Sequence, residues 1–145
     1  MMKWTKGEHE IDTEKTRLDV GLIHRFLAED SYWAKGISRE RVERAIERSC
    51  CFGLYRGARQ LGYARVVSDE VTFAYLCDVF VLPDARGAGL GKWLVEVSTG
   101  QHQVRRWMLG TLDAHGLYAQ HGFAPMREPQ RFMERLDPDI YTRGG

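Results

Sequence analysis

The chain contains 145 residues, a length that suits one domain built around one hydrophobic core. Hydrophobic residues make up 43% and charged residues 28% of it, as in ordinary globular proteins; no apolar stretch is long enough to span a bilayer, and residues 1–10 lack the apolar run of a signal peptide. The formal net charge of +1 offers no bulk attraction for nucleic acid or for an anionic membrane. We therefore expect a single domain over residues 1–145 that resides in the cytoplasm and binds neither nucleic acid nor membrane.

The first part of the chain predicts one strand followed by two helices. Residues 9–15 suit a short strand. Asp19 is a suitable N-cap for a first helix that ends near Asp30. A polar and aromatic connection follows over residues 31–36, and Ser38 is a suitable cap for a second helix. The apolar residues at helical spacing are Leu22, Ile23, Phe26 and Leu27 in the first helix and Val42, Ala45 and Ile46 in the second.

The rest of the chain predicts strands first and then an alternation of helices and strands. Residues 51–55 and 61–67 flank a hairpin turn, and a long strand over residues 72–82 stops at Pro83. The later elements are a helix from 90 to about 100, a strand over 104–109, a short helix over 114–120, and one or two closing strands within 123–136. The order β-α-α-β-β-β-α-β-α-β predicts a mixed α/β sheet with helices on both faces and one parallel, right-handed crossover.

The sequence offers no disulfide framework and no metal site. Its three cysteines are Cys50, Cys51 and Cys77. This count and spacing fit neither a disulfide scaffold nor a zinc pattern, so we expect free thiols. Asp113, His115 and His121 surround the short predicted helix, but their spacing does not place all three on one face. We expect these three side chains to form ordinary hydrogen bonds, and we expect no bound metal.

A glycine-rich stretch between a predicted strand and a predicted helix carries the strongest functional signal. Residues 83–92 read Pro-Asp-Ala-Arg-Gly-Ala-Gly-Leu-Gly-Lys. Three glycines allow unusual backbone angles and a close approach to a ligand. The backbone amides would point outward at a helix N-terminus, where the helix dipole is positive, and Arg86 and Lys92 add charge beside them. The stretch therefore predicts an anion site that fits a pyrophosphate.

Three kinds of phosphate-binding loop compete for this stretch. A Walker loop requires Ser or Thr where Trp93 stands and glycine where Arg86 stands. A dinucleotide-binding fingerprint requires glycine where Lys92 stands. The pattern that fits is Arg-x-x-Gly-x-Gly, formed by Arg86, Gly89 and Gly91. It resembles the coenzyme A loop of the GCN5-related N-acetyltransferase (GNAT) superfamily.

A second motif extends this resemblance. Residues 114–123 are similar to the family's short helix that closes in Tyr-x-x-x-Gly-Phe, so Tyr118 would be the general acid. The resemblance covers residues 10–136 and implies transfer of an acetyl group from acetyl-coenzyme A (acetyl-CoA) to a primary amine in a direct ternary complex. One departure is Thr111, which stands where the family commonly has Asn for a contact to the cofactor. The residues that the resemblance assigns to the cofactor are Phe80, Val81, Arg86, Gly87, Ala88, Gly89, Gly91 and Lys92.

The implied chemistry needs a base, an oxyanion donor and an acid. An alkylamine has a pKa of about 10 and must lose a proton before it attacks the thioester. A backbone N–H near residues 79–81 would stabilise the oxyanion, and Tyr118 would protonate the leaving thiolate. Asp78 is our choice of base, although it could instead be an ion-pair partner within the sheet. The other candidates for the base are Glu29, Asp30, Asp113 and a relay of water molecules.

The acceptor amine has no recognisable motif. Tyr32 and Trp33 could form one wall of its pocket or could equally be core anchors, and Tyr75 is a further candidate. A small molecule or a protein could carry the amine. Two other functions remain open: an acetyltransferase acting on aminoacyl-tRNA, which the near-neutral charge disfavours, and a non-catalytic acyl-CoA sensor, which would not need Tyr118. A homodimer is a common outcome in the family.

Overall fold

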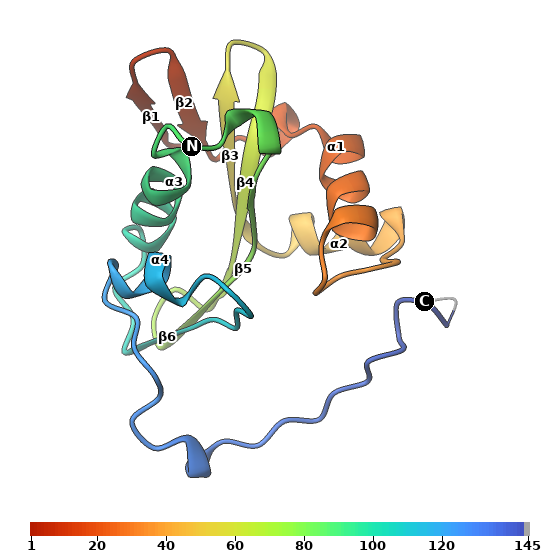
Figure 1. Ribbon diagram of the computed structural model, residues 1–145, viewed down its shortest axis with the longest axis vertical. Coiled ribbons are helices and arrows are strands. Elements are labelled where there is room, and N and C mark those ends of the chain that lie inside the picture. The colour runs from red at the N-terminus through yellow and green to blue at the C-terminus, as the bar shows by residue number, and fades with distance from the viewer. Residues whose placement is uncertain (144–145) are drawn as a thin grey trace.

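The computed structural model describes residues 1–143 as one six-stranded sheet with helices on both faces (Figure 1). The strands lie in chain order from β1 to β6, and all neighbours are antiparallel except β5 and β6, which are parallel. The strands are β1 (Lys3–Lys6), β2 (His9–Asp12), β3 (Cys50–Arg56), β4 (Arg59–Ser68), β5 (Phe73–Val81) and β6 (Arg106–Met108). The helices are α1 (Val20–Arg25), α2 (Arg39–Glu47), α3 (Leu90–Thr99) and α4 (His115–Ala119). The predicted mixed α/β sheet and its parallel crossover through α3 are confirmed.

One face of the sheet packs against α3. Leu94 and Val95 of this helix are fully buried in a cluster with Phe52 of β3 and Val66 of β4. Burial of each such side chain stabilises the fold by roughly 1.5–3 kcal/mol. Gly89 caps the helix at a φ of 75°, in the left-handed region that glycine enters without strain. Among residues 1–143, no helix is both long and apolar enough to cross a membrane.

The other face packs against α1 and α2. The N-caps are those predicted: Asp19 accepts a hydrogen bond from the N–H of Leu22 at 3.1 Å, and Ser38 accepts one from Arg41 at 3.2 Å. After α1 the chain continues through a π-helical turn, η2 (Phe26–Asp30). The ring of Phe26 stacks on Phe80 of β5 with 4.0 Å between ring centroids, which fixes the end of the long strand to the helical layer.

β5 contains a bulge. β4 and β5 lose their register between Tyr63 and Arg65, so that Asp78 and Val79 lie opposite a single residue of β4. Asp78 has a φ of 53°, in the left-handed region that non-glycine residues seldom adopt. The backbone of β5 therefore changes direction at the residue that the sequence analysis singled out as a base.

The bulge also changes the faces that the side chains of β5 occupy. Before it, Ala74 and Leu76 pack into the core beneath α3. Strict alternation would send Phe80 to the same side, but Phe80 packs into the core beneath α1 and α2. Asp78 thereby points to the α1–α2 face, next to the side chain of Arg65.

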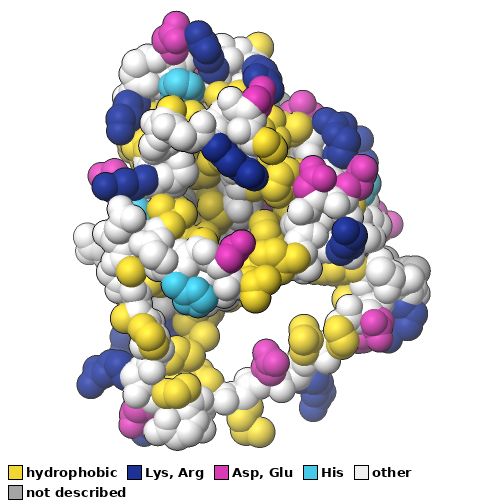
Figure 2. Space-filling view, in the orientation of Figure 1, with side chains coloured by type: hydrophobic (Ala, Val, Ile, Leu, Met, Phe, Trp, Pro, Cys, Tyr) yellow, Lys and Arg dark blue, Asp and Glu magenta, His cyan; other side chains and the backbone are white. Residues whose placement is uncertain are grey.

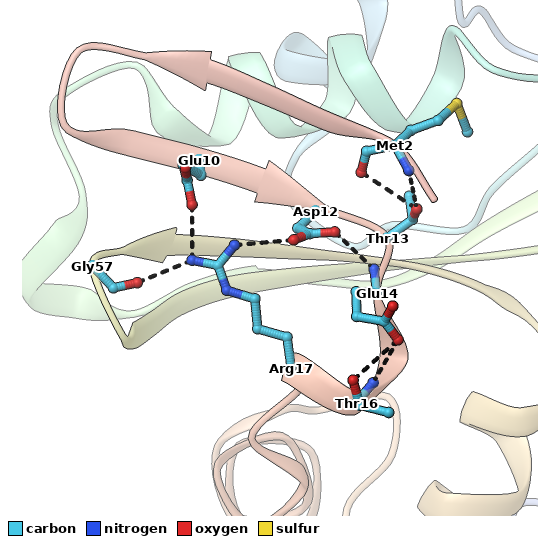
Figure 3. Close-up of polar contacts among 8 residues, drawn as sticks. All are labelled: Met2, Glu10, Asp12, Thr13, Glu14, Thr16, Arg17 and Gly57. Carbon is cyan, nitrogen blue, oxygen red and sulfur yellow. Dashed lines mark hydrogen bonds and ion pairs between the residues drawn. The ribbon is translucent and has the colours of Figure 1, made fainter.

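Arg17 ties the N-terminal hairpin to the body of the sheet (Figure 3). Its guanidinium pairs with Glu10 at 2.9 Å and with Asp12 at 3.0 Å, and donates to the carbonyl of Gly57 at 3.0 Å. Asp12 is buried and also accepts a hydrogen bond from the N–H of Glu14 at 2.9 Å. Burial alone would raise the pKa of Asp12, but the hydrogen bonds from Glu14 and Arg17 hold it below its usual value.

The expectations for the two ends of the sheet are partly wrong. The strand predicted over residues 9–15 is shorter, and it pairs with β1, which was not predicted because Trp4 is its only partly buried residue. Residues 123–136 contain no strand. Pro125 and Pro129 lack the N–H that a sheet ladder needs. The chain instead forms what we call the C-terminal arm, residues 124–143, which runs away from the sheet and returns beside α2 (Figure 1).

Candidate active site

The site lies where β5 and β6 part. The two strands pair only as far as Tyr75 and Met108, whereas β5 continues to Val81. Beyond Tyr75, the edge of β5 that faces β6 has no strand neighbour within residues 1–143. Backbone groups along that edge are available to a bound molecule that adds to the sheet like a strand.

A cavity of about 150 Å³ lies at this parting and collects side chains from both faces of the sheet. The connection after η2 contributes Tyr32 and Trp33, β5 contributes Tyr75 and Asp78, and α4 contributes Tyr118. The structure thus brings together the five residues that the sequence analysis assigned to catalysis or to the acceptor. Their proximity agrees with a shared site, and their individual roles stay predictions.

Tyr118 reaches the cavity from the α3 side of the sheet. Its ring packs edge-on against Phe123 with 6.1 Å between centroids, and it contacts the core beneath α3. Burial raises the pKa of the Tyr118 phenol above its usual value, and Tyr32 and Asp113 add to the rise. The phenol therefore keeps its proton into strongly alkaline solution, which a proton donor requires.

Asp78 is held between two donors on the opposite side. Its Oδ1 accepts a hydrogen bond from Nε1 of Trp33 at 2.9 Å, and its Oδ2 accepts one from Nε of Arg65 at 2.8 Å. Arg65 also donates to Oγ of Ser49 at 3.0 Å. The Arg65 and Asp78 side chains are 19% and 11% exposed, so the ion pair is mostly buried. Burial alone would lower the pKa of Arg65, but the Asp78 carboxylate raises it above its usual value.

Arg65 is a site residue that the sequence analysis missed. It stands in the middle of the predicted strand 61–67, among residues that are otherwise apolar or small. A buried arginine needs a partner, so an arginine within an apolar strand signals a carboxylate on a neighbouring strand. That signal would have paired Arg65 with Asp78.

Tyr32 connects the two sides of the parting. Its hydroxyl accepts a 2.7 Å hydrogen bond from the backbone N–H of Leu112, in the segment between β6 and α4. Its ring meets Trp33 edge-on at 5.1 Å. Tyr32 and Trp33 are 52% and 40% exposed, which assigns them to the wall of the site rather than to the core.

The glycine loop presents a row of open backbone donors. Within residues 1–143, the N–H groups of residues 87–92 have no hydrogen-bond acceptor. Gly87 and Gly89 have φ values of 94° and 75°, and a Cβ on either would meet no atom within 4 Å. Nε of Arg86 donates to the carbonyl of Val81 at 2.9 Å, which braces the loop. Lys92 is exposed on the first turn of α3. This geometry fits a polyanion at the N-terminus of α3.

Phe80 and Val81, which were also assigned to the cofactor, lie at the end of β5 and not in the glycine loop. The side chain of Phe80 is 5% exposed and belongs to the core beneath α1, so only its backbone can contact a ligand. A Cβ added to Gly91 would meet Cγ2 of Val81 at 3.8 Å. The end of β5 and the first turn of α3 therefore lie close together.

A second cavity, of about 520 Å³, lies on the α1–α2 face and shares Trp33 and Asp78 with the first. Arg65 lines it from the sheet, and Tyr141 of the C-terminal arm lines it from the other side. The remaining lining residues come largely from α1, α2 and the connection between them. The bond between Trp33 and Asp78 therefore stands at the border between the two cavities.

Cys77 lines the smaller cavity but is a poor nucleophile. Burial raises the pKa of its thiol to about 12, and Asp78 adds to the rise while Arg65 opposes it. Its Sγ lies 3.6 Å from the carbonyl oxygen of Arg65. The thiol therefore stays protonated near neutral pH and lacks the reactivity of a covalent acetyl carrier.

Comparisons with known proteins agree with this geometry. A family model described as "Acetyltransferase (GNAT) domain" matches residues 47–125, which include β5, the glycine loop and α4. A Gibberella zeae protein, FG08082, which is named as an inferred acetyltransferase, is 32% identical over 149 residues, covering 86% of this chain and 84% of that protein.

Solved structures share the fold. A crystal structure from Xanthomonas campestris pv. campestris, assigned to the GNAT family, is 48% identical, with a TM-score of 0.89 over 92% of this chain and 96% of that chain. Rv2747 from Mycobacterium tuberculosis, solved with CoA and NLQ, is 19% identical, with a TM-score of 0.59 over 81% of this chain and 72% of that chain. At the latter identity the likeness concerns the fold alone.

Proposed function

The chain belongs to the GNAT acetyltransferase family, and we propose that it transfers the acetyl group of acetyl-CoA directly to a primary amine. The proposal rests on one observation above all: a row of open backbone amides at the start of α3 leads, along the free edge of β5, to a cavity that contains Tyr118. The start of α3 would thus bind an anion, the free edge of β5 would bind an extended chain, and Tyr118 would donate a proton.

The glycine loop would hold the pyrophosphate of the cofactor. The amides of residues 87–92 supply hydrogen bonds, and Arg86 and Lys92 supply positive charge. Gly87 and Gly89 leave the backbone open to close approach because they carry no side chain, and Ala88 between them carries only a methyl group. The pantetheine chain would lie along the open edge of β5, where the backbone of Phe80 and Val81 can pair with its amides.

The acceptor would approach from the larger cavity. That cavity meets the smaller one at Trp33 and Asp78, so an amine held there could reach a thioester lying at the parting of the strands. The exposed rings of Tyr32 and Tyr75 would flank its path. Binding of the two substrates in two adjoining cavities suits a direct ternary complex, because neither substrate has to leave before the other binds.

Acetyl-CoA supplies the thioester carbonyl that the amine attacks. The bulge turns the backbone of β5 beside the cavity, so an N–H in residues 79–81 would stabilise the negative charge that develops on the carbonyl oxygen. Tyr118 would give its proton to the departing thiolate, since the raised pKa of its phenol keeps that proton available.

Asp78 remains the proposed base. In that role it would have to accept a proton while it keeps the hydrogen bonds that it already accepts. Each of its oxygens already accepts one hydrogen bond, from Trp33 and from Arg65, but a carboxylate oxygen has a second acceptor site. Asp78 would take the proton of the amine, directly or through a water molecule, while both donors hold it in place. Asp113, which also lines the smaller cavity, is the alternative acceptor of that proton.

Calorimetric titration with acetyl-CoA tests the proposal. The wild-type protein should bind in the micromolar range, and the double variant Arg86→Ala, Gly89→Val should not bind. The matched control is Arg56→Ala, Gly57→Val, which alters an arginine and a left-handed glycine in the turn between β3 and β4. Failure of the wild-type protein to bind would refute the proposal, and equal binding by both double variants would place the cofactor away from the loop.

A further inference from the structure

The larger cavity carries more positive than negative charge. Its lining includes four arginines and two carboxylates, which are Arg41, Arg44, Arg48, Arg65, Glu40 and Asp78. Arg65 and Asp78 neutralise each other through their ion pair at 2.8 Å. The other four residues belong to α2 or directly follow it, and among them three arginines stand against Glu40. The side of the cavity that α2 forms is therefore positively charged.

The charges of α2 are sorted between the cavity and the solvent. Arg41, Arg44 and Arg48 follow one another at intervals of three and four residues, so they share one face of the helix. Glu43 and Glu47 are exposed and do not line the cavity. The helix dipole favours cations near the C-terminus of α2, but it acts equally on every face. The dipole therefore does not explain why the arginines lie along the cavity and these glutamates lie away from it.

Arg44 and Arg48 have no counter-ion in their own chain. Both are exposed, and within residues 1–143 neither guanidinium has an ion pair or a hydrogen bond. On the same helix Arg39 does pair, with Glu43 at 3.7 Å. Two like charges four residues apart destabilise a helix. An anion bound between Arg44 and Arg48 would remove this repulsion.

The rest of the cavity suits the body of a small molecule. Its volume of about 520 Å³ is usual for a small-molecule site, and much of its lining between α2 and the border with the smaller cavity is apolar. Ile23, Leu27 and Ile37 belong to that apolar part. Of the C-terminal arm only Tyr141 lines the cavity, and an open window separates the earlier part of the arm from the body of the protein (Figure 2).

We propose that the acceptor is a small amine that carries a carboxylate or a phosphate at the end away from the amine, and that Arg44 and Arg48 bind this anionic group. The inference rests on the proposed function, which places the amine beside Asp78. The forked guanidinium of arginine matches the oxygens of a carboxylate and of a phosphate equally well. A polyamine is a poor acceptor here, because its second ammonium group would meet the arginines.

Rates of thiol release from acetyl-CoA, measured on matched pairs of amines, test the inference. β-Alanine, γ-aminobutyrate and δ-aminovalerate are each compared with their amides, and phosphoethanolamine is compared with ethanolamine. In at least one pair the anionic member should have a kcat/KM higher by about tenfold or more, as expected for a charge-assisted hydrogen bond. The pair with the largest ratio identifies the anion as a carboxylate or a phosphate. Added salt should weaken this preference, because both arginines are exposed.

The double variant Arg44→Gln, Arg48→Gln should lose the preference, and Arg44→Lys, Arg48→Lys should keep part of it. Both side chains are exposed, so the circular dichroism should match that of the wild type. The control is Arg25→Gln, Arg39→Gln, which removes the same charge from exposed arginines of α1 and α2 that do not line either cavity of the site. This control should keep the full preference.

Two kinetic outcomes overturn the inference: equal or better use of the neutral amine in every pair, and a preference that survives in the glutamine variant. Calorimetric titration with the same anionic amines, with and without CoA to fill the glycine loop, decides the case in which no amine is acetylated. Binding that the glutamine variant abolishes would support the inference. A protein that binds acetyl-CoA but none of these anions refutes only the inference. One that binds the anions through the arginines but does not bind acetyl-CoA refutes only the proposed function.

Discussion

The indole N–H of Trp33 donates a 2.9 Å hydrogen bond to Oδ1 of Asp78, and this bond joins the connection between two helices to the bulge of the central strand. The other oxygen of Asp78 binds Arg65. One carboxylate thus positions both the aromatic wall between the two cavities and the bulged backbone of β5. A change at any of these three residues should disturb both.

We expect Asp78→Asn to lower kcat by about 10²–10⁴-fold, the usual contribution of a positioned base. The loss should persist at saturating concentrations of both substrates, because an amide cannot accept the proton of the attacking amine. A loss of less than about tenfold would contradict the role of base and leave Asp78 a positioning residue.

Trp33→Phe is the matched variant, since it keeps an aromatic ring but removes the donor to Asp78. The loss of one hydrogen bond to a charged group corresponds to roughly 1.5–3 kcal/mol. We expect KM for the amine to rise and the shape of the pH–rate profile to stay unchanged. A shifted profile would show that Trp33 acts on the titration of the site.

We expect Tyr118→Phe to reduce turnover by about 10²–10⁴-fold and to leave the calorimetric affinity for acetyl-CoA nearly intact. The phenyl ring keeps the packing against Phe123, and only the proton donor is lost. Because burial raises the pKa of Tyr118, the wild-type enzyme should not lose activity through this group at a pH where an ordinary tyrosine is still protonated. An equal loss of turnover and of acetyl-CoA binding would contradict the role of Tyr118 as the general acid.

Cys77→Ala should retain most of the activity. Burial raises the pKa of this thiol to about 12, so almost no thiolate exists near neutral pH. Iodoacetamide should therefore label the folded protein slowly at Cys77, as followed by peptide mass spectrometry, and rapidly once the protein is unfolded. Complete loss of activity in the alanine variant, together with an acetylated Cys77 in the wild type, would point to a covalent carrier.

Asp12→Asn should destabilise the fold by roughly 1–3 kcal/mol at neutral pH, because the guanidinium of Arg17 loses one of its charged partners. The pKa of Asp12 in the folded state lies below its usual value, so its stabilising contribution is complete above about pH 4–5 and is lost as the pH falls through the folded pKa. Denaturant unfolding at several pH values should show the two proteins converging in acid.

Asp84→Asn is the control for that experiment, because Asp84 pairs with Arg59 where both side chains are about 60% exposed. An exposed pair of this kind contributes about 0–1 kcal/mol. A loss of stability as large as that of Asp12→Asn would mean that burial is not what distinguishes Asp12.

Local patterns in the sequence predicted most of the fold. The caps Asp19 and Ser38, the turn between β3 and β4, and the glycines before α3 act within a few residues, so they can be read without tertiary information. β1 escaped prediction because an exposed edge strand needs no apolar alternation. The closing strands predicted within residues 123–136 are wrong, because that segment pairs with no strand of the described residues 1–143.

The site was predictable only in part, for a similar reason. The glycine loop and the segment around Tyr118 are each continuous in the sequence, and the structure places the loop at the start of α3 and Tyr118 in the cavity where β5 and β6 part. The partnership of Asp78 with Arg65 depends on strand pairing, and the bulge that aims it depends on a shift of register between β4 and β5. Neither can be derived from the spacing of residues along one strand.

The left-handed backbone at Asp78 lowers the stability of the fold, but the side chain that causes this cost also holds Arg65 and Trp33 in place. Glycine at this position would relieve the conformational cost, on the order of 1–3 kcal/mol, of holding a residue with a side chain in that region. The same change would leave the mostly buried guanidinium of Arg65 without its carboxylate and Trp33 without its acceptor. Selection for heat resistance alone would therefore find no simple improvement here, because the residue that distorts the strand is also the one that neutralises the charge beside it.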